Sequence, residues 1–261
     1  EDAWGVRMEH LLRFATLALL DRPGSTLQDI LPIFLDTKFR AEVLRHVRDP
    51  QVRHFWTVEY PSMNYKTATD GLAPIANKLG AFLAHPLIRR AVCEPAAPLR
   101  FRRIMDEGGI LIVNLATGRV GADNANVLGG LIVSSMMNAA FSRYNLPEIE
   151  RRPFLLYVDE FHAFTTSASA GMLSEVRKYG VGVTLAHQYI LQADREVFEA
   201  IMGNVGSLFT FRIGAIDAPL IATQFHGVGE RDLTALANYA GFAQIMVDGV
   251  RTKAFSVGTW R

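Results

Sequence analysis

Two carboxylates come directly after an apolar run, and this pair has the clearest chemical potential in the sequence. Residues 154–158 are Phe-Leu-Leu-Tyr-Val, and Asp159 and Glu160 follow them. In open α/β sheets, ligands bind outside the carboxyl ends of the strands. An Asp at that place can order the water shell of Mg²⁺, and the next Glu can polarise the water that attacks a terminal phosphate. The same pair could instead cap the loop or the next helix.

A glutamine and an arginine could complete such a site. Gln188 ends the next apolar run, and because parallel strands end side by side it could share a crevice with Asp159. It could equally be an ordinary strand-end amide, and alternation points His187 away from it. Arg177 lies in the last turn of a predicted helix that Gly180 ends. There it would favour the helix dipole, or reach across a subunit boundary as an arginine finger.

The elements that position these residues follow an alternating pattern. Apolar runs rich in β-branched residues predict strands, and periodic segments between them predict helices. Strands are predicted at 110–115, 154–158, 182–185 and 207–213, and helices at 123–144, 170–178 and 195–202. This order predicts βαβ units and a mainly parallel sheet. Residues 243–247 and 253–257 flank Asp248-Gly249, which predicts an antiparallel hairpin at the end of the chain.

The first hundred residues have apolar side chains at helical spacing and no alternating strand pattern. Ser25 or Thr26 is placed to cap the helical run that begins at Leu27. A stretch with two prolines, 94–98, suggests a boundary. The predicted fold class is therefore α/β, with an all-helical accessory domain at 1–98 and an α/β domain at 99–261.

The amino-acid composition and the net charge limit the classes of protein to which this chain can belong. The chain has 261 residues, of which 49% are hydrophobic and 20% charged, and this excludes a disordered chain. Lys and Arg number 27 against 26 Asp and Glu, so no overall charge points to nucleic acid. Residues 1–106 carry 15 basic against 12 acidic side chains, with a cluster at Arg100, Arg102 and Arg103. This small excess of positive charge is expected on a helix face exposed to solvent, and a weakly basic stripe that faces DNA would also produce it.

The single cysteine and the longest uncharged stretch exclude two further classes. Cys93 is the only cysteine, so an internal disulfide is impossible and a reducing compartment is expected. The stretch 124–142 is long enough to suggest a membrane span, but it holds three Asn and three Ser. A helix buried between protein layers is the better explanation.

Two other kinds of catalytic site, a metal site and a Ser or Cys nucleophile, have less support in the sequence. Asp159, Glu160 and His162 could hold a metal in a hydrolase, but no His-Glu-x-x-His helix or second pair of histidines accompanies them. A Ser or Cys nucleophile would need a Gly-x-Ser-x-Gly turn, which does not occur.

Taken in order, the motifs resemble the RecA-like motors of the FtsK/HerA superfamily, most closely the coupling ATPases of type IV secretion and conjugation. The resemblance is carried by residues 156–162, 173–181 and 185–189, with support from 113–121, 128–131 and 211–217. It covers about residues 105–261. The helical first part resembles, by position and composition, the all-α domain that those proteins insert in their motor domain.

The resemblance assigns roles to five residues. Asp159 and Glu160 match the Walker B carboxylates, with Asp159 holding Mg²⁺ through water and Glu160 as catalytic base. Gln188 matches a phosphate-sensing glutamine, Arg177 an arginine finger, and Arg212 a recurrent arginine placed with the nucleotide-binding residues. The implied cofactors are ATP and Mg²⁺. The implied partners are DNA, the type IV secretion machinery and five further copies in a hexameric ring. The implied location is the cytoplasmic side of a bacterial inner membrane.

One departure from the family is large. No Gly-x-x-x-x-Gly-Lys-Ser/Thr occurs in the 261 residues, so the loop that binds phosphates in the family has no counterpart. The chain begins at Glu1 rather than Met, and we expect a fragment of a longer protein that carries this loop upstream. The chain alone should bind ATP weakly or not at all, and it could be a monomer. The alternative is a non-hydrolysing module that recruits DNA or protein substrates to a secretion channel.

Overall fold

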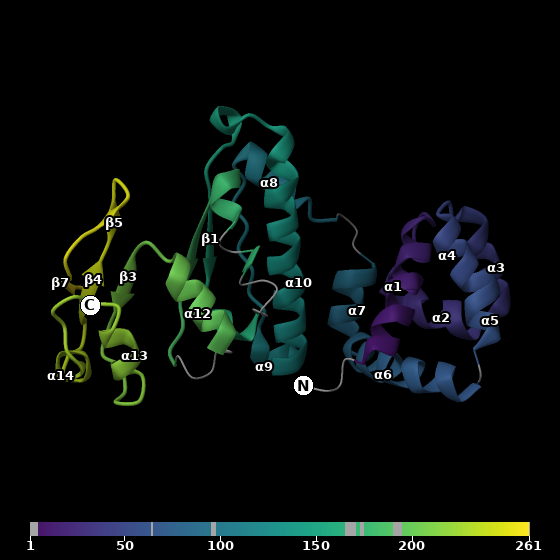
Figure 1. The fold of residues 1–261 in the computed structure, drawn as a ribbon, viewed down its shortest axis with the longest axis horizontal. Helices are drawn as coiled ribbons and strands as arrows, with labels where there is room; N and C mark the ends of the chain where they lie inside the picture. Colours follow the sequence, from purple (N-terminus) through teal and green to yellow (C-terminus); the bar gives the residue numbers. More distant parts are fainter. Residues whose placement is uncertain are drawn as a thin grey trace. The chain divides into compact units, whose positions relative to one another are not determined.

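The computed structural model describes residues 5–63, 65–94, 98–164, 171–172, 175–189 and 195–260 (Figure 1). The chain divides into two compact units. Unit 1 comprises Glu1–Leu99 and Leu115–Ala125, and unit 2 comprises Arg100–Asn114 and Asn126–Arg261.

Unit 1 is helical throughout its described part, as the spacing of apolar residues predicted. Thr26 is the cap: its hydroxyl accepts the Gln28 N–H at 3.2 Å, and its own N–H donates to Asp29 Oδ2 at 2.8 Å. This reciprocal pattern is a capping box. The helical segments are α1 (Val6–Leu20), η1 (Leu27–Asp29), α2 (Ile30–Leu35), α3 (Thr37–His46), α4 (Pro50–His54), η2 (Phe55–Glu59), α5 (Tyr60–Ser62), α6 (Tyr65–Ala84), α7 (Pro86–Cys93) and α9 (Thr117–Val120).

The core of unit 1 combines aliphatic side chains with a cluster of aromatic rings. Phe55 and Trp56 are buried in η2, a π-helical turn. The rings of Phe14 and Phe55 stack with centroids 4.2 Å apart, and the Trp56 indole N–H donates to the Phe14 carbonyl at 3.1 Å. The polar end of this large apolar side chain is thus satisfied inside the core. Unit 1 therefore has a hydrophobic core of its own.

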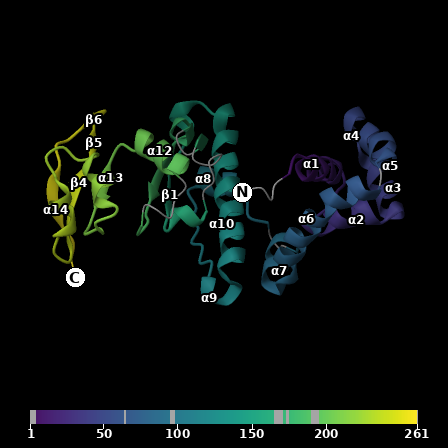
Figure 2. The ribbon, with the colours of Figure 1, turned by 60° about the horizontal axis from the view of Figure 1, so that its bottom comes forward.

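Unit 2 places a long helix against a parallel strand pair. Strands β1 (Phe154–Val158) and β2 (Val181–Leu185) pair in parallel, from Phe154 opposite Val181 to Val158 opposite Leu185. Helix α10 (Ala122–Phe141) lies beside β1 in both views (Figures 1 and 2). Its buried Met137 belongs to the same core cluster as Leu156. Between α7 and β2, the part of unit 2 that the structure describes also contains α8 (Phe101–Glu107), η3 (Ser142–Asn145), η4 (Glu148–Glu150), η5 (Phe161–Ala163), η6 (Val176–Tyr179) and helical residues at 171–172 and 175.

Helix α10 corresponds to the uncharged stretch noted in the sequence. In the described part of the chain, one helical stretch, Ala122–Asn145, is long and apolar enough to cross a membrane, with a third of its apolar window buried. One face of it packs in the core of unit 2 through Val133, Met136, Met137 and Ala140. The predicted burial between protein layers is therefore met on one face of the helix, whereas Val127 and Leu131 on it are exposed.

The predicted strand at 110–115 is wrong for this structure. The segment after α8 has no ladder partner among the described residues. The side chains of Ile110 and Ile112 are 91% and 88% exposed. Composition favoured a strand, but a strand exists only where another backbone offers hydrogen bonds, and β2 is the one strand that pairs with β1 among the described residues.

The end of unit 2 is antiparallel. Strands β3 (Leu208–Thr210), β4 (Ala240–Gln244) and β7 (Phe255–Gly258) form a sheet in the order β3-β4-β7. Strands β5 (Met246–Val247) and β6 (Val250–Arg251) form the predicted hairpin, whose turn residues Asp248 and Gly249 have φ of 48° and 81°. Helices α12 (Arg195–Asn204), α13 (Ala218–Ala222) and α14 (Glu230–Thr234) complete the unit. The expected mainly parallel sheet is corrected, because only β1 and β2 pair in parallel within the described residues.

Candidate functional site

The turn after β1 presents the two predicted carboxylates. Val158 is buried at the end of the strand, Asp159 is exposed and Glu160 is half-buried. Glu160 has φ of 48° and ψ of 46°, the left-handed conformation that costs a non-glycine residue about 1 kcal/mol. Its N–H donates to Asp159 Oδ1 at 3.0 Å. Strained backbone of this kind clusters at functional sites, and this turn sets the directions of both carboxylates.

Gln188 is brought to the same edge of the sheet. The parallel pairing continues past the strands, because the Ala186 N–H donates to the Val158 carbonyl at 2.9 Å and the Phe161 N–H donates to the Ala186 carbonyl at 3.2 Å. Gln188 is exposed two residues beyond Ala186. The two strand ends therefore form one bonded edge that carries Asp159, Glu160 and Gln188.

Two histidines at this edge were not identified as members of the phosphate site from sequence. The Nδ1 of His162 lies 3.4 Å from Glu160 Oε2. The ring of His187 meets the ring of Phe161 edge to face, with centroids 4.8 Å apart. Phe161 is buried after the end of β1, and His187 after the end of β2 packs against it. The sequence signal was the short interval between Glu160 and His162, which suggested only a poorly supported metal site and not a contact between the two side chains.

Arg177 lies apart from these residues within the chain. It is exposed on η6, which Gly180 ends in the left-handed conformation with φ of 75°, as predicted. Strand β2 begins at Val181 and is five residues long, so its two ends lie about 15 Å apart. Arg177 precedes the amino end of β2, whereas Gln188 follows its carboxyl end. Of the predicted helix 170–178, Gly171, Met172 and Glu175 are helical and Val176–Tyr179 forms the turn η6, whereas residues 170, 173 and 174 lie outside the described residues.

Lys178, the residue that follows Arg177, forms an ion pair. Lys178 donates to Glu175 Oε2 at 2.5 Å, and this hydrogen bond raises the pKa of the Lys178 ammonium. Arg177 forms no ion pair with any residue that the structure describes. Pairing with Glu175 therefore accounts for Lys178, whereas the Arg177 guanidinium has no acidic partner among the described residues.

A buried arginine supports the amino end of the same strands. The side chain of Arg143 is fully buried. Its guanidinium donates to the Tyr179 carbonyl at 2.9 Å and the Arg152 carbonyl at 2.6 Å, and its Nε lies 3.0 Å from Asp106 Oδ1. It thereby ties η6 and the start of β1 to α8.

Arg212 belongs to the other sheet. It follows β3, is exposed, and its Nη2 donates to Asn238 Oδ1 at 3.1 Å. The contacts of β1 and β2 therefore bring together three of the five predicted residues, Asp159, Glu160 and Gln188. Arg177 and Arg212 lie on other segments.

The residues fit a weakly held Mg²⁺ better than a metal held by protein ligands alone. No group of three His, Cys, Asp or Glu side chains in the described part of the chain is placed to hold a metal ion. Asp159 offers an exposed oxygen ligand, and Mg²⁺ is commonly bound by one or two carboxylates together with waters and substrate phosphates. This chain can therefore supply the carboxylate of such a site, while the phosphate-binding loop is missing from the sequence.

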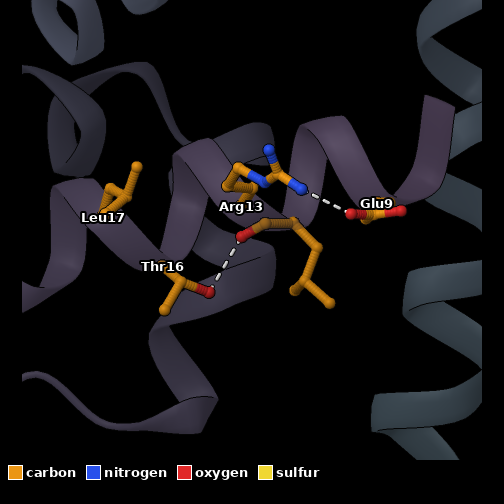
Figure 3. A pocket seen from close by; sticks show the side chains of 5 residues that line it. Glu9, Arg13, Thr16 and Leu17 are labelled. Atoms are coloured by element: carbon orange, nitrogen blue, oxygen red, sulfur yellow. Dashed lines mark hydrogen bonds and ion pairs between the residues drawn. The ribbon is translucent and has the colours of Figure 1, made fainter. Parts of the chain in front are cut away.

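A shallow hollow on α1 is unconnected with this chemistry. It lies on one face of that helix in unit 1 and is lined by Glu9, Leu12, Arg13, Thr16 and Leu17 (Figure 3). Its polar groups are engaged locally, because Arg13 pairs with Glu9 and the Thr16 hydroxyl donates to the Leu12 carbonyl at 2.8 Å. A hollow between successive turns of one helix offers no convergent set of groups to a ligand.

Comparisons with solved structures show which fold this is. The chain is similar over 98% of its length to the bacterial conjugative coupling protein TrwBdeltaN70 in an unbound form, with a TM-score of 0.65 and 15% identity. It is similar to the plasmid coupling protein TrwB in complex with the non-hydrolysable ATP analogue ADPNP, with a TM-score of 0.63, 16% identity and 98% coverage. A TrwBdeltaN70 structure in complex with sulphate gives a TM-score of 0.61 and 14% identity, again over 98% of the chain.

The likeness is one of fold. The chain spans 63% of the length of each of these three structures. No family model matches the sequence, and no curated protein matches it significantly. The α/β fold with its helical unit is therefore that of the conjugative coupling protein structures.

Proposed function

We propose that this chain is the later part of an ATP-driven coupling ATPase of a conjugation or type IV secretion system, which hydrolyses Mg-ATP at subunit interfaces and moves DNA. The observation that carries the proposal is the bonded edge of β1 and β2. It holds Asp159, Glu160 and Gln188 at the carboxyl ends of parallel strands, where α/β proteins bind ligands. Similarity to TrwB, including a form that holds an ATP analogue, supports it.

Each residue at the edge has a distinct proposed role. Bound Mg-ATP would supply a charge-neutralised phosphoryl group. Asp159 would hold the water shell of the metal, and Glu160, half-buried beside it, would accept a proton from the attacking water. Gln188, on the adjoining strand end, would donate to the terminal phosphate. Arg177 would act on the nucleotide of a neighbouring subunit, and Arg212 would contribute to nucleotide binding.

The rest of the chain fits this proposal. Residues 99–261 would form the Walker B half of a RecA-like motor domain, and residues 1–98 the helical accessory domain. The parent protein would form a homo-hexamer anchored at the bacterial inner membrane, with this part on the cytoplasmic side. The 63% coverage of the TrwB chains leaves room for a phosphate-binding loop outside these residues.

The test is a Glu160→Gln substitution in a chain that includes the upstream segment. Removal of the proton acceptor should lower ATP turnover by at least about 100-fold and leave nucleotide affinity unchanged. Turnover is measured by phosphate release and affinity by a fluorescent ATP analogue. Glu175→Gln is the matched control, because Glu175 is exposed and pairs with Lys178. Unchanged turnover in Glu160→Gln would overturn the proposal.

One observation favours a second candidate, a non-hydrolysing interaction module. The 261 residues contain no Gly-Lys-Ser or Gly-Lys-Thr loop, and without backbone N–H groups around the phosphates an ATP site is incomplete. Such a module would recruit DNA or a protein substrate to a secretion channel. Absence of ATP turnover in the extended chain, with retained binding of DNA or a substrate protein, would favour it.

A further inference from the structure

The Glu160 side chain has an unexpected neighbour. His162 comes from η5, and its Nδ1 lies 3.4 Å from Glu160 Oε2. That nitrogen is shielded from solvent and makes no hydrogen bond with any described residue. A buried ring nitrogen without a hydrogen bond is costly, and in native structures such groups call for an explanation. A slight movement of either side chain would turn this ion-pair contact into a hydrogen bond.

The backbone between the two residues makes the contact specific. Glu160 is in the left-handed conformation, and Phe161 is 2% exposed in the core of unit 2. The Phe161 N–H is bonded to the Ala186 carbonyl, and the Ala163 N–H donates to the Glu160 carbonyl at 3.0 Å. A buried aromatic anchor and two backbone bonds thus hold the turn, so the side chains on either side of Phe161 converge.

The carboxylate of Glu160 needs such a partner. It is about one-third exposed, and a Glu side chain has three rotatable bonds, so it samples several rotamers unless something holds it. A proton acceptor works only when its oxygen is within hydrogen-bond reach of the water it deprotonates. His162 is the side chain whose ring nitrogen meets that carboxylate.

We propose that His162 is a positioning residue that orients the Glu160 carboxylate through its Nδ1–H. The proposal rests on the proposed function, in which Glu160 is the catalytic base. It places the ring proton on Nδ1, because a carboxylate oxygen is an acceptor. No third His, Cys, Asp or Glu side chain among the described residues joins His162 and Glu160 in a group that could hold a metal ion.

The contact is tested first in the 261-residue chain, without ATP. The ring nitrogens of the histidines are observed by long-range ¹H–¹⁵N NMR, and the His162 signals are assigned by their loss in His162→Asn. His162 should show a protonated Nδ1, and Glu160→Gln should move its signals while those of His46 on α3 stay in place. Unmoved His162 signals in Glu160→Gln would overturn the proposal.

The role is tested by turnover in the chain extended upstream. His162→Ala should lower kcat by on the order of 10-fold or more without changing KM, since misplacement of a reacting group slows the chemical step. His162→Asn should recover part of the loss, because the Asn amide nitrogen can occupy the place of Nδ1. A purely structural role would give no recovery, or would change KM and the melting temperature of both variants together, and would overturn the proposal.

The same experiment separates this inference from the proposed function. If Glu160→Gln abolishes turnover and His162→Ala preserves it, the ATPase stands and the positioning role is wrong. If Glu160→Gln leaves turnover intact, the proposed function fails, and the positioning role fails with it even where the NMR contact is observed.

Discussion

At the scale of single residues, the buried Arg143 of unit 2 is held by backbone carbonyls that lie just before two strands. Arg143 satisfies two carbonyls, from Arg152 before β1 and from Tyr179 before β2, and pairs with Asp106. Bringing a guanidinium out of water is costly, and its hydrogen bonds must offset that cost. The arginine therefore fixes the amino ends of β1 and β2, from which the strands run to the candidate site.

Substitution of Arg143 tests this role. Arg143→Ala should lower the free energy of unfolding of unit 2 by about 3 kcal/mol, because it leaves Asp106 and two carbonyls without their buried partner. Native-state hydrogen exchange of the β1 and β2 amides measures it. Arg195→Ala, which removes an exposed pair with Glu199 on α12, should leave these amides unchanged. Equal effects of the two substitutions would contradict the assignment.

At the scale of elements, strand pairing depends on residues that make room for the neighbouring backbone. Gly241 is buried in β4, and a Cβ there would lie 2.5 Å from the Thr210 carbonyl oxygen on β3. Glycine is needed because only the absence of a side chain permits this approach. Gly203 on α12 has open space around it, and in a helix glycine costs conformational entropy.

These two glycines predict effects of opposite sign. Gly241→Ala should destabilise the β3-β4-β7 sheet by about 1–3 kcal/mol, because the β3 backbone must move. Gly203→Ala should stabilise α12 by about 0.5 kcal/mol. The midpoint of thermal unfolding measures the change in stability of each variant, and hydrogen exchange of the β4 amides shows whether the sheet is affected. Stabilisation by Gly241→Ala would contradict the close approach of β3 to β4 at this position.

At the scale of the whole molecule, the proposed catalytic groups do not all meet in one chain. Asp159, Glu160 and Gln188 share the carboxyl edge of β1 and β2, whereas Arg177 is exposed at the amino end of β2. A complete site in the proposed ring therefore combines the carboxylates of one subunit with the arginine of the next. Subunits with different defects should then complement one another.

Mixed assemblies provide the test. In the extended chain, Arg177→Ala alone should lower turnover by about 10³-fold and spare nucleotide affinity. Mixing it with Glu160→Gln subunits should restore part of the activity, because some interfaces then pair an intact Glu160 with an intact Arg177. Lys178→Ala is the matched control and should keep turnover. A mixture as inactive as either variant alone would place Arg177 in the site of its own subunit.

The sequence by itself determined much of this protein. Apolar periodicity located the helices of unit 1, the strands β1 and β2, and the Asp248-Gly249 hairpin, because these depend on local propensity and on the burial of one face. The parallel order of β1 and β2 also followed, and with it the shared edge of Asp159, Glu160 and Gln188. Local signals suffice for helices and tight turns, which satisfy their backbone within the segment, and they located β1 and β2 because each of these strands has the other as its partner.

Other features were decided only by the tertiary structure. Residues 110–115 have the composition of a strand but join no strand ladder in the part of the chain that the structure describes, because a strand requires hydrogen bonds from a neighbouring backbone. The left-handed Glu160 and the approach of His162 depend on Phe161 entering the core and bonding to Ala186. No local pattern encodes the Phe161–Ala186 bond, since it joins segments that are distant in sequence and meet only when the two strands pair.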